Sequence, residues 1–150
     1  DFKKGIALDI GLSEVAIKYY DENIKKDYSV CFSHERINAS YEFFCPDNII
    51  VDCKARDLSE LVKYSFFHDK LNLNEFVTFM DTISLSIGDY IMLYSRLLFP
   101  TYFFDCIEFN KNCYTIYSKI NQYEKLLNEI YYIIRKRCDL PPVEWLIKKI

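Results

Sequence analysis

Two short apolar segments in the first half of the chain each lead into side chains that can do chemistry. Residues 28–32, Tyr-Ser-Val-Cys-Phe, run into Ser33-His34-Glu35-Arg36, and residues 49–51, Ile-Ile-Val, run into Asp52. A histidine titrates near neutral pH and can serve as a general base, and a carboxylate can hold a divalent cation. The pattern predicts a loop centred on His34, followed by a second strand that delivers the carboxylate of Asp52.

The elements that must position these residues are a small β element and the helices around it. Residues 2–20 repeat apolar side chains at helical spacing and predict a helix. Residues 28–32 are rich in β-prone side chains and predict a strand. Residues 41–44 and 48–51 flank Cys45-Pro46-Asp47-Asn48, which has turn chemistry, so these two segments predict a β-hairpin.

From residue 57 onward the pattern is helical. Asp57-x-x-Glu60 and Asn72-x-x-Glu75 have the form of a capping box, which makes Asp57 and Asn72 the predicted N-caps of two helices. Further helices are predicted over 86–99, 101–110 and 121–138, and in a last short stretch that begins at Pro141-Pro142. The predicted fold class is mostly α with a small β-hairpin (α+β), in a single domain that spans residues 1–150.

The composition of the 150 residues excludes several classes of function. The chain has three glycines, Gly5, Gly11 and Gly88, and their spacing forms neither Gly-rich nucleotide-binding motif. Its net charge is -3 with mixed signs throughout, which argues against a nucleic-acid partner. No apolar run approaches the roughly 20 residues that a membrane-spanning helix needs. The six cysteines follow no disulfide-like spacing, so we expect reduced thiols in an intracellular protein.

The order of the segments resembles the helical C-terminal lobe of aminoglycoside phosphotransferase and choline kinase-like proteins. In that fold, a catalytic loop of the form His-Gly-Asp-x-x-x-x-Asn precedes a strand that ends in a metal-binding Asp, and a helix with an Asp-Leu pair follows. The details are most similar to endospore coat-associated proteins of the YutH and CotS type. The resemblance is carried by Ser33-His34-Glu35-Arg36, Ala55-Arg56-Asp57-Leu58, the block from Tyr94 to Pro100 and the block from Leu140 to Leu146.

This resemblance implies that His34 matches the histidine of the catalytic loop and that Asp52 matches the metal ligand. Glu35 then stands at the family's Gly, and Arg36 stands at its catalytic Asp. A guanidinium cannot accept the substrate's proton, and its charge repels a metal ion. The Asn position falls on Tyr41, and the Lys and Gly-rich loop of a nucleotide lobe are absent from these residues.

We therefore expect a pseudokinase-like protein of the spore coat that binds other coat proteins and needs no cofactor. On this interpretation His34 is a structural remnant that hydrogen-bonds the backbone of its loop, and Asp52 satisfies turn amides unless it holds a metal. Most of the 13 Tyr and 12 Phe should lie in the core, and an apolar patch left outside it would indicate a binding partner.

Two alternatives compete with this interpretation. The first is a divergent small-molecule phosphotransferase that uses ATP and Mg²⁺, with Asp52 as metal ligand, Glu35 or Glu42 as base, and a nucleotide lobe outside these residues. The second is an unrelated helical interaction protein of the host-modulating type found in viruses. The predicted hairpin over 41–52 discriminates between them, because a purely helical bundle has no use for it.

Overall fold

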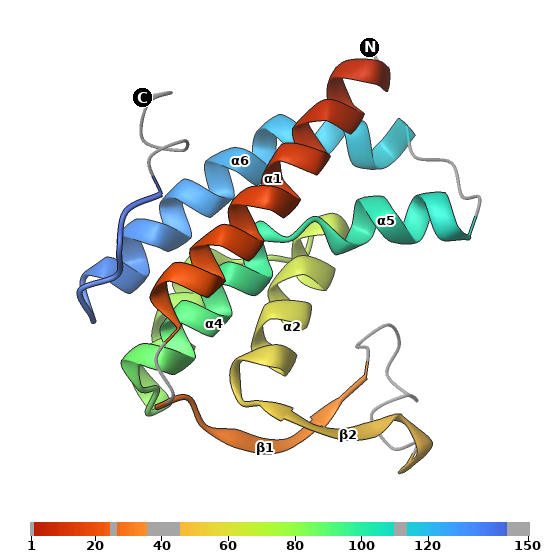
Figure 1. Ribbon diagram of the computed structural model, residues 1–150. Coiled ribbons are helices and arrows are strands. Elements are labelled where there is room, and N and C mark those ends of the chain that lie inside the picture. Colours follow the sequence, from red (N-terminus) through yellow and green to blue (C-terminus); the bar gives the residue numbers. More distant parts are fainter. Residues whose placement is uncertain (1, 25–26, 36–45, 110–113, 144–150) are drawn as a thin grey trace.

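This computed structural model describes residues 2–24, 27–35, 46–109 and 114–143, and within them the chain forms six α-helices, one 3-10 helix and a two-stranded sheet (Figure 1). In chain order the elements are α1 (Phe2–Asn23), β1 (Val30–His34), the 3-10 helix η2 (Pro46–Asn48), β2 (Ile49–Cys53), α2 (Ala55–Phe67), α3 (Leu73–Thr82), α4 (Ile87–Leu98), α5 (Thr101–Glu108) and α6 (Tyr114–Arg135). The predicted fold class, mostly α with a small β element, is confirmed.

Helix α4 is the centre of the core, with α1, α2 and α6 packed around it (Figure 1). A capping box between Ser86 and Asp89 begins this helix, and Pro100 follows its end. Tyr94 is wholly buried, and its hydroxyl donates to the Leu127 carbonyl of α6 at 3.2 Å. A buried phenol needs such a partner, so the tyrosines of the core fix the register between helices as well as filling space.

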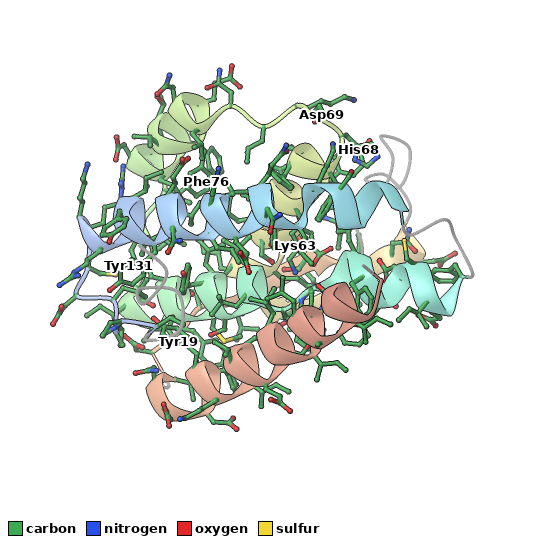
Figure 2. The ribbon with its side chains drawn as sticks, turned by 90° about the horizontal axis from the view of Figure 1, so that it is seen from above. Tyr19, Lys63, His68, Asp69, Phe76 and Tyr131 are labelled. Carbon is green, nitrogen blue, oxygen red and sulfur yellow. The ribbon has the colours of Figure 1, made fainter. Side chains whose placement is uncertain are left out.

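Tyr19 of α1 and Tyr131 of α6 lie at one end of the bundle (Figure 2). Their rings contact Tyr94 at centroid distances of 5.6 and 5.7 Å. The Tyr19 hydroxyl donates to the Pro141 carbonyl at 3.0 Å, and the Tyr131 hydroxyl donates to the Leu140 carbonyl at 3.4 Å. These two bonds hold the segment after α6 against the bundle. Residues 141–143, where the last helix is predicted to begin, are not helical, and the rest of that predicted helix lies outside the described residues.

The two strands are antiparallel, with pairs that run from Val30 opposite Cys53 to His34 opposite Ile49. Residues 41–44, which are predicted to form a hairpin with 48–51, lie outside the described residues. In the described part of the chain, β2 pairs with β1. The first strand also begins at Val30 rather than at residue 28. Its start is displaced because the Ser29 amide and hydroxyl both donate to the buried Asp89 carboxylate, at 2.7 and 3.0 Å.

Two predicted helix starts are wrong. Helix α2 begins at Ala55, and its N-cap position is Lys54 with no side-chain cap, so Asp57 is not the N-cap. The reason is that the Asp57 carboxylate is bonded to His34. Helix α6 begins at Tyr114 rather than at residue 121, and Lys119 in its early turns donates to the Phe67 carbonyl at 3.0 Å.

The N-cap at Asn72 is confirmed, because its side chain accepts from the Asn74 amide at 3.0 Å. Of the six cysteines, Cys31, Cys53 and Cys138 are free thiols. None of the helices in the described part of the chain is both long enough and apolar enough to cross a bilayer.

Candidate functional site

The end of strand β1 is tied to the first turn of α2 through one carboxylate. The His34 backbone amide donates to Asp57 Oδ1 at 2.8 Å, and the His34 ring nitrogen Nδ1 lies 2.8 Å from Asp57 Oδ2. An ionised carboxylate only accepts hydrogen bonds, so the ring carries its proton on Nδ1. Asp57 therefore fixes both the position and the tautomer of His34.

Arg56 holds the same region from the neighbouring position of α2. Its Nε donates to the His34 carbonyl at 2.9 Å, and its Nη2 donates to the Glu35 carbonyl at 2.6 Å. Its Nη1 donates to Asp52 Oδ2 at 2.5 Å. One planar guanidinium thus joins the end of β1 to the end of β2, which is a geometry that Arg supplies and Lys cannot.

Asp52 is surrounded by donors. Its Oδ2 accepts from Arg56 and also from Arg96 Nη2 of α4 at 2.8 Å, and its Oδ1 accepts from the Cys53 amide at 2.6 Å. Burial alone would raise the pKa of the Asp52 carboxyl, but these hydrogen bonds and the two arginine charges hold that pKa below its ordinary value. Asp52 is therefore ionised, and both of its oxygens are occupied by protein donors.

This arrangement does not fit a divalent metal ion. Mg²⁺ would have to displace a guanidinium from Asp52 and would then face the positive charges of Arg56 and Arg96. Among the residues that the structure describes, no three His, Cys, Asp or Glu side chains gather closely enough to bind a metal. What the cluster does instead is join β1, β2, α2 and α4.

An open groove leads away from this cluster. It has a volume of about 420 Å³ and lies between α1, α4 and the end of β2. Asp52 and Arg96 line it together with mainly apolar and aromatic side chains, among them Ile17, Tyr20 and Phe99. The size and the mixture of an apolar wall with a few polar groups are typical of small-molecule sites.

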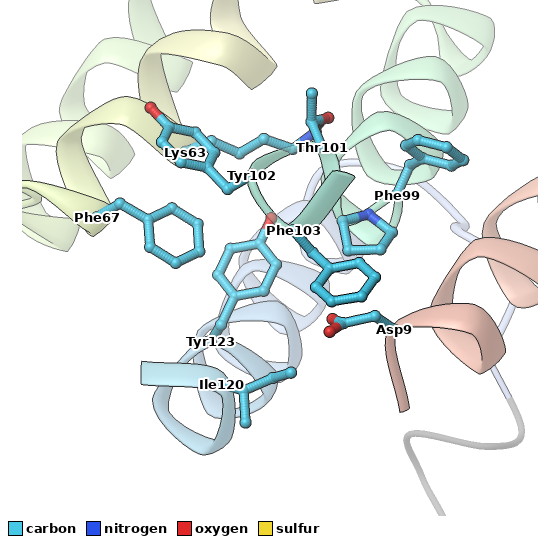
Figure 3. Close-up of a pocket in the computed structure, with 10 residues that line it drawn as sticks. Asp9, Lys63, Phe67, Phe99, Thr101, Tyr102, Phe103, Ile120 and Tyr123 are labelled. Atoms are coloured by element: carbon cyan, nitrogen blue, oxygen red, sulfur yellow. Dashed lines mark hydrogen bonds between the residues drawn. The ribbon is translucent and has the colours of Figure 1, made fainter. Parts of the chain in front are cut away.

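A second, smaller cavity lies deeper, between α1, α2, α5 and α6 (Figure 3). Its volume of about 20 Å³ has room for one water molecule. Asp9, which is 2% exposed, points toward Phe103 there, and Asp9 Oδ2 has no hydrogen-bond partner among the described residues. Burial raises the pKa of Asp9 from 3.8 to about 7. The buried Lys63 ammonium lines the same cavity and donates to Thr101 Oγ1 at 2.8 Å.

Comparison with known protein families shows which family has this cluster within its matched region. The family described as "Spore coat putative kinase YutH" matches residues 9–137. This chain belongs to that family. The endospore coat-associated protein YutH of Bacillus subtilis (strain 168) is 27% identical over an alignment of 171 positions, which covers 93% of this chain and 50% of that relative. The chain thus spans about half the length of the curated relative that it matches. No solved structure matches it.

The match confirms the resemblance to YutH-type proteins that was drawn from the sequence. It covers the whole cluster from His34 to Arg96, as well as most of α1 and all of α6. The alternative of an unrelated helical interaction protein is contradicted by this match. The described two-stranded sheet also gives the chain a β element that a helical bundle would lack.

The structure brings His34 and Asp52 into one cluster, as the order of the segments suggested. Glu35 follows them with an exposed side chain, and its carbonyl is the group that contacts Arg56. Arg36, Tyr41 and Glu42 lie outside the described residues. The roles of His34, Glu35 and Arg36 in a degenerate catalytic loop therefore stay predictions.

Arg96 is the member of the cluster that sequence reasoning missed. It lies 44 positions from Asp52 along the chain, so local spacing cannot connect the two. A signal did exist, because Arg96 is the only charged residue between Asp89 and Asp105. A lone charge in an apolar helix needs a partner when it is buried, and an ionised residue from another element is the natural one.

Proposed function

We propose that this YutH-family chain is a non-catalytic kinase-fold protein of the spore coat that acts by binding other coat proteins. The observation that carries the proposal is that Asp52 forms ion pairs with two arginines. Phosphoryl transfer needs this carboxylate to hold Mg²⁺ against the phosphates of the nucleotide. Here Arg56 and Arg96 hold it instead, and they bring two positive charges to one negative charge.

The contacts around His34 support the same proposal. Asp57 accepts from the His34 backbone and ring, and Arg56 donates to the carbonyls of His34 and Glu35. These bonds make the start of the loop a fixed structural joint between the sheet and α2. A rigid joint suits a protein that presents a surface to a partner.

The kinase fold and the coat location rest on the family. Its description contains both "spore coat" and "kinase", and the Bacillus subtilis relative is named as coat-associated. The order of strand, histidine loop, second strand and Asp-Leu helix supports the kinase-like C-lobe, with Asp52 at the position of the metal ligand.

The location in the spore coat can be tested with a fluorescent fusion of this chain in sporulating Bacillus subtilis. We expect fluorescence at the spore surface, and diffuse fluorescence in the mother cell would contradict the coat assignment.

The loss of catalysis can be tested by thermal unfolding with and without Mg²⁺ and ATP. A ligand at about a hundred times its Kd stabilises the protein that binds it by roughly 2.7 kcal/mol. We expect no shift for the wild type at millimolar Mg²⁺ and ATP, and the same result for Asp52→Asn. Stabilisation of the wild type that Asp52→Asn abolishes, together with transfer of labelled phosphate to any acceptor, would overturn the proposal.

The second candidate is a divergent phosphotransferase. It is favoured by the word "kinase" in the family description and by the length of the Bacillus subtilis relative, of which this chain covers 50%. Asp52 would be its metal ligand, and Glu35 or Glu42 its base. In the longest natural form of the protein, Asp52→Asn should then abolish turnover of ATP, whereas unchanged turnover would remove Asp52 from the mechanism.

A further inference from the structure

The first turns of α1 are held to the bundle mainly by Asp9. Of the side chains that the structure describes over residues 6–11, Asp9 is the only one in the buried class, and Leu8 is half-buried. The second half of the helix is held differently, because Leu12 and Tyr19 lie in the hydrophobic core. The docking of residues 6–11 therefore depends on a side chain that can ionise.

The cavity around Asp9 offers its carboxyl no hydrogen-bond donor. The side chain points toward Phe103, and Oδ2 has no partner among the described residues (Figure 3). The other titratable groups that line the cavity come one each from α2, α5 and α6 and are Lys63, Tyr102 and Tyr123. The Tyr123 hydroxyl donates to the Leu97 carbonyl at 2.6 Å, so its proton is directed away from Asp9.

Lys63 is the cation that lines this cavity in the described part of the chain, and it is directed to other groups. Its ammonium donates to Thr101 Oγ1 at 2.8 Å and lies 3.9 Å from the Glu60 carboxylate. The pKa of Asp9 is accordingly raised, from 3.8 to about 7, by burial. Ionised Asp9 is thus a buried charge that the closed arrangement does not compensate.

Movement of the first turns of α1 into solvent satisfies this charge better than hydration inside the cavity. The cavity volume of about 20 Å³ admits one water molecule. An ionised carboxylate accepts about four hydrogen bonds, so one water leaves most of its acceptor sites without a donor. Ile10, next to Asp9, is 48% exposed, so these turns already lie at the surface of the molecule.

We propose that Asp9 is a proton-dependent latch for the first turns of α1. The neutral carboxyl keeps residues 6–11 docked against the bundle, and its ionisation releases them while the second half of the helix stays in place. The inference goes beyond the proposed coat function, because it assigns to the fold a response to pH that protein binding does not require.

Native-state hydrogen exchange of the full chain at pH 5 and pH 8 tests the latch. An opening that brings Asp9 into water lowers its pKa from about 7 toward 3.8, so the opening becomes more favourable as pH rises between these values. After correction for the intrinsic pH dependence of exchange, we expect the protection factors of the amides of residues 6–11 to fall roughly 50- to 100-fold.

Low concentrations of urea distinguish a local opening from unfolding of the whole chain. Exchange of residues 6–11 at pH 8 should not depend on urea, because a local opening exposes little new surface. The amides of residues 16–20 are the internal reference, and their exchange should accelerate with urea. Equal protection of residues 6–11 at the two pH values would overturn the proposal. A loss that accelerates with urea in step with residues 16–20 would also overturn it, since pH would then act on the whole fold.

Asp9→Asn keeps the size of the side chain and removes its charge, so residues 6–11 should be equally protected at pH 5 and pH 8. Glu14→Gln is the matched control, because Glu14 is an exposed carboxylate of the same helix, and it should keep the wild-type response. A wild-type response in Asp9→Asn would assign the proton to another group and overturn the proposal. The pH and urea dependence of the wild type decides the question if Asp9→Asn does not fold.

Discussion

At the scale of single residues, Asp9 is a buried carboxyl whose ionisation affects the stability of the fold. It is 2% exposed, lies among aromatic rings, and leaves Oδ2 without a partner among the described residues. Burial without compensating donors disfavours the charged form and raises the pKa of Asp9 from 3.8 to about 7. The folded state therefore holds a proton that the unfolded state releases, and folding becomes less favourable as pH rises from about 4 through 7.

Asp9→Asn should remove this pH dependence. Between pH 5 and pH 8 the wild type should lose roughly 2–3 kcal/mol of unfolding free energy that the variant keeps. Urea unfolding at the two pH values measures the difference. Ser13→Ala is the control, since Ser13 is a buried polar residue one turn further along α1 that donates to the Asp9 carbonyl at 2.8 Å. It should keep the wild-type slope, and a wild-type slope in Asp9→Asn would show that another group causes the pH dependence.

At the scale of elements, the attachment of the sheet to the core depends on Asp89. This wholly buried carboxylate accepts from the Ser29 amide and hydroxyl and from the Ser86 amide, at 2.7, 3.0 and 3.0 Å. It closes the capping box of α4 and also holds the chain that enters β1. Burial alone would raise its pKa, but the hydrogen bonds from Ser86 and Ser29 hold the pKa of Asp89 below its ordinary value.

Asp89→Ala leaves these donors without their acceptor and should destabilise the protein by about 2–4 kcal/mol. Ser29→Ala removes only one hydroxyl donor and should cost about 1 kcal/mol. Because the folded pKa is low, the Asp89 contribution is present above about pH 4 and is lost as pH falls below that value. Urea unfolding of both variants at neutral and acidic pH checks the order, and a smaller loss for Asp89→Ala than for Ser29→Ala would contradict it.

These elements show what a single sequence can predict here. Periodicity located α1 and α4 closely, and Asn72 was recognised as an N-cap because its partners lie within three residues. Asp57 looked equally like a cap from its local sequence. The Asp57 side chain instead hydrogen-bonds His34, which lies 23 positions away along the chain, and so it does not cap α2. The order of segments pointed to His34 and Asp52, but Arg96 and Asp89 act across the fold, where local patterns carry no information.

At the scale of the whole molecule, the sheet extends beyond the core that surrounds α4 (Figure 1). Phe32, Val51 and Val30 are 81%, 68% and 60% exposed, and Phe32 lies opposite Val51 across the two strands. Exposed apolar side chains gathered on a small sheet favour association between molecules. They contribute little to the stability of the single chain, because their area stays in contact with water when the protein folds.

The double substitution Phe32→Thr and Val51→Thr should therefore raise solubility and reduce concentration-dependent association in sedimentation experiments. Threonine is β-branched and suits a strand at both positions, so the free energy of unfolding should stay within about 0.5 kcal/mol of the wild type. Leu97→Ala, at a wholly buried position of α4, is the contrasting variant and should cost about 2–5 kcal/mol. A comparable loss in the threonine variant would mean that another part of the chain covers these side chains.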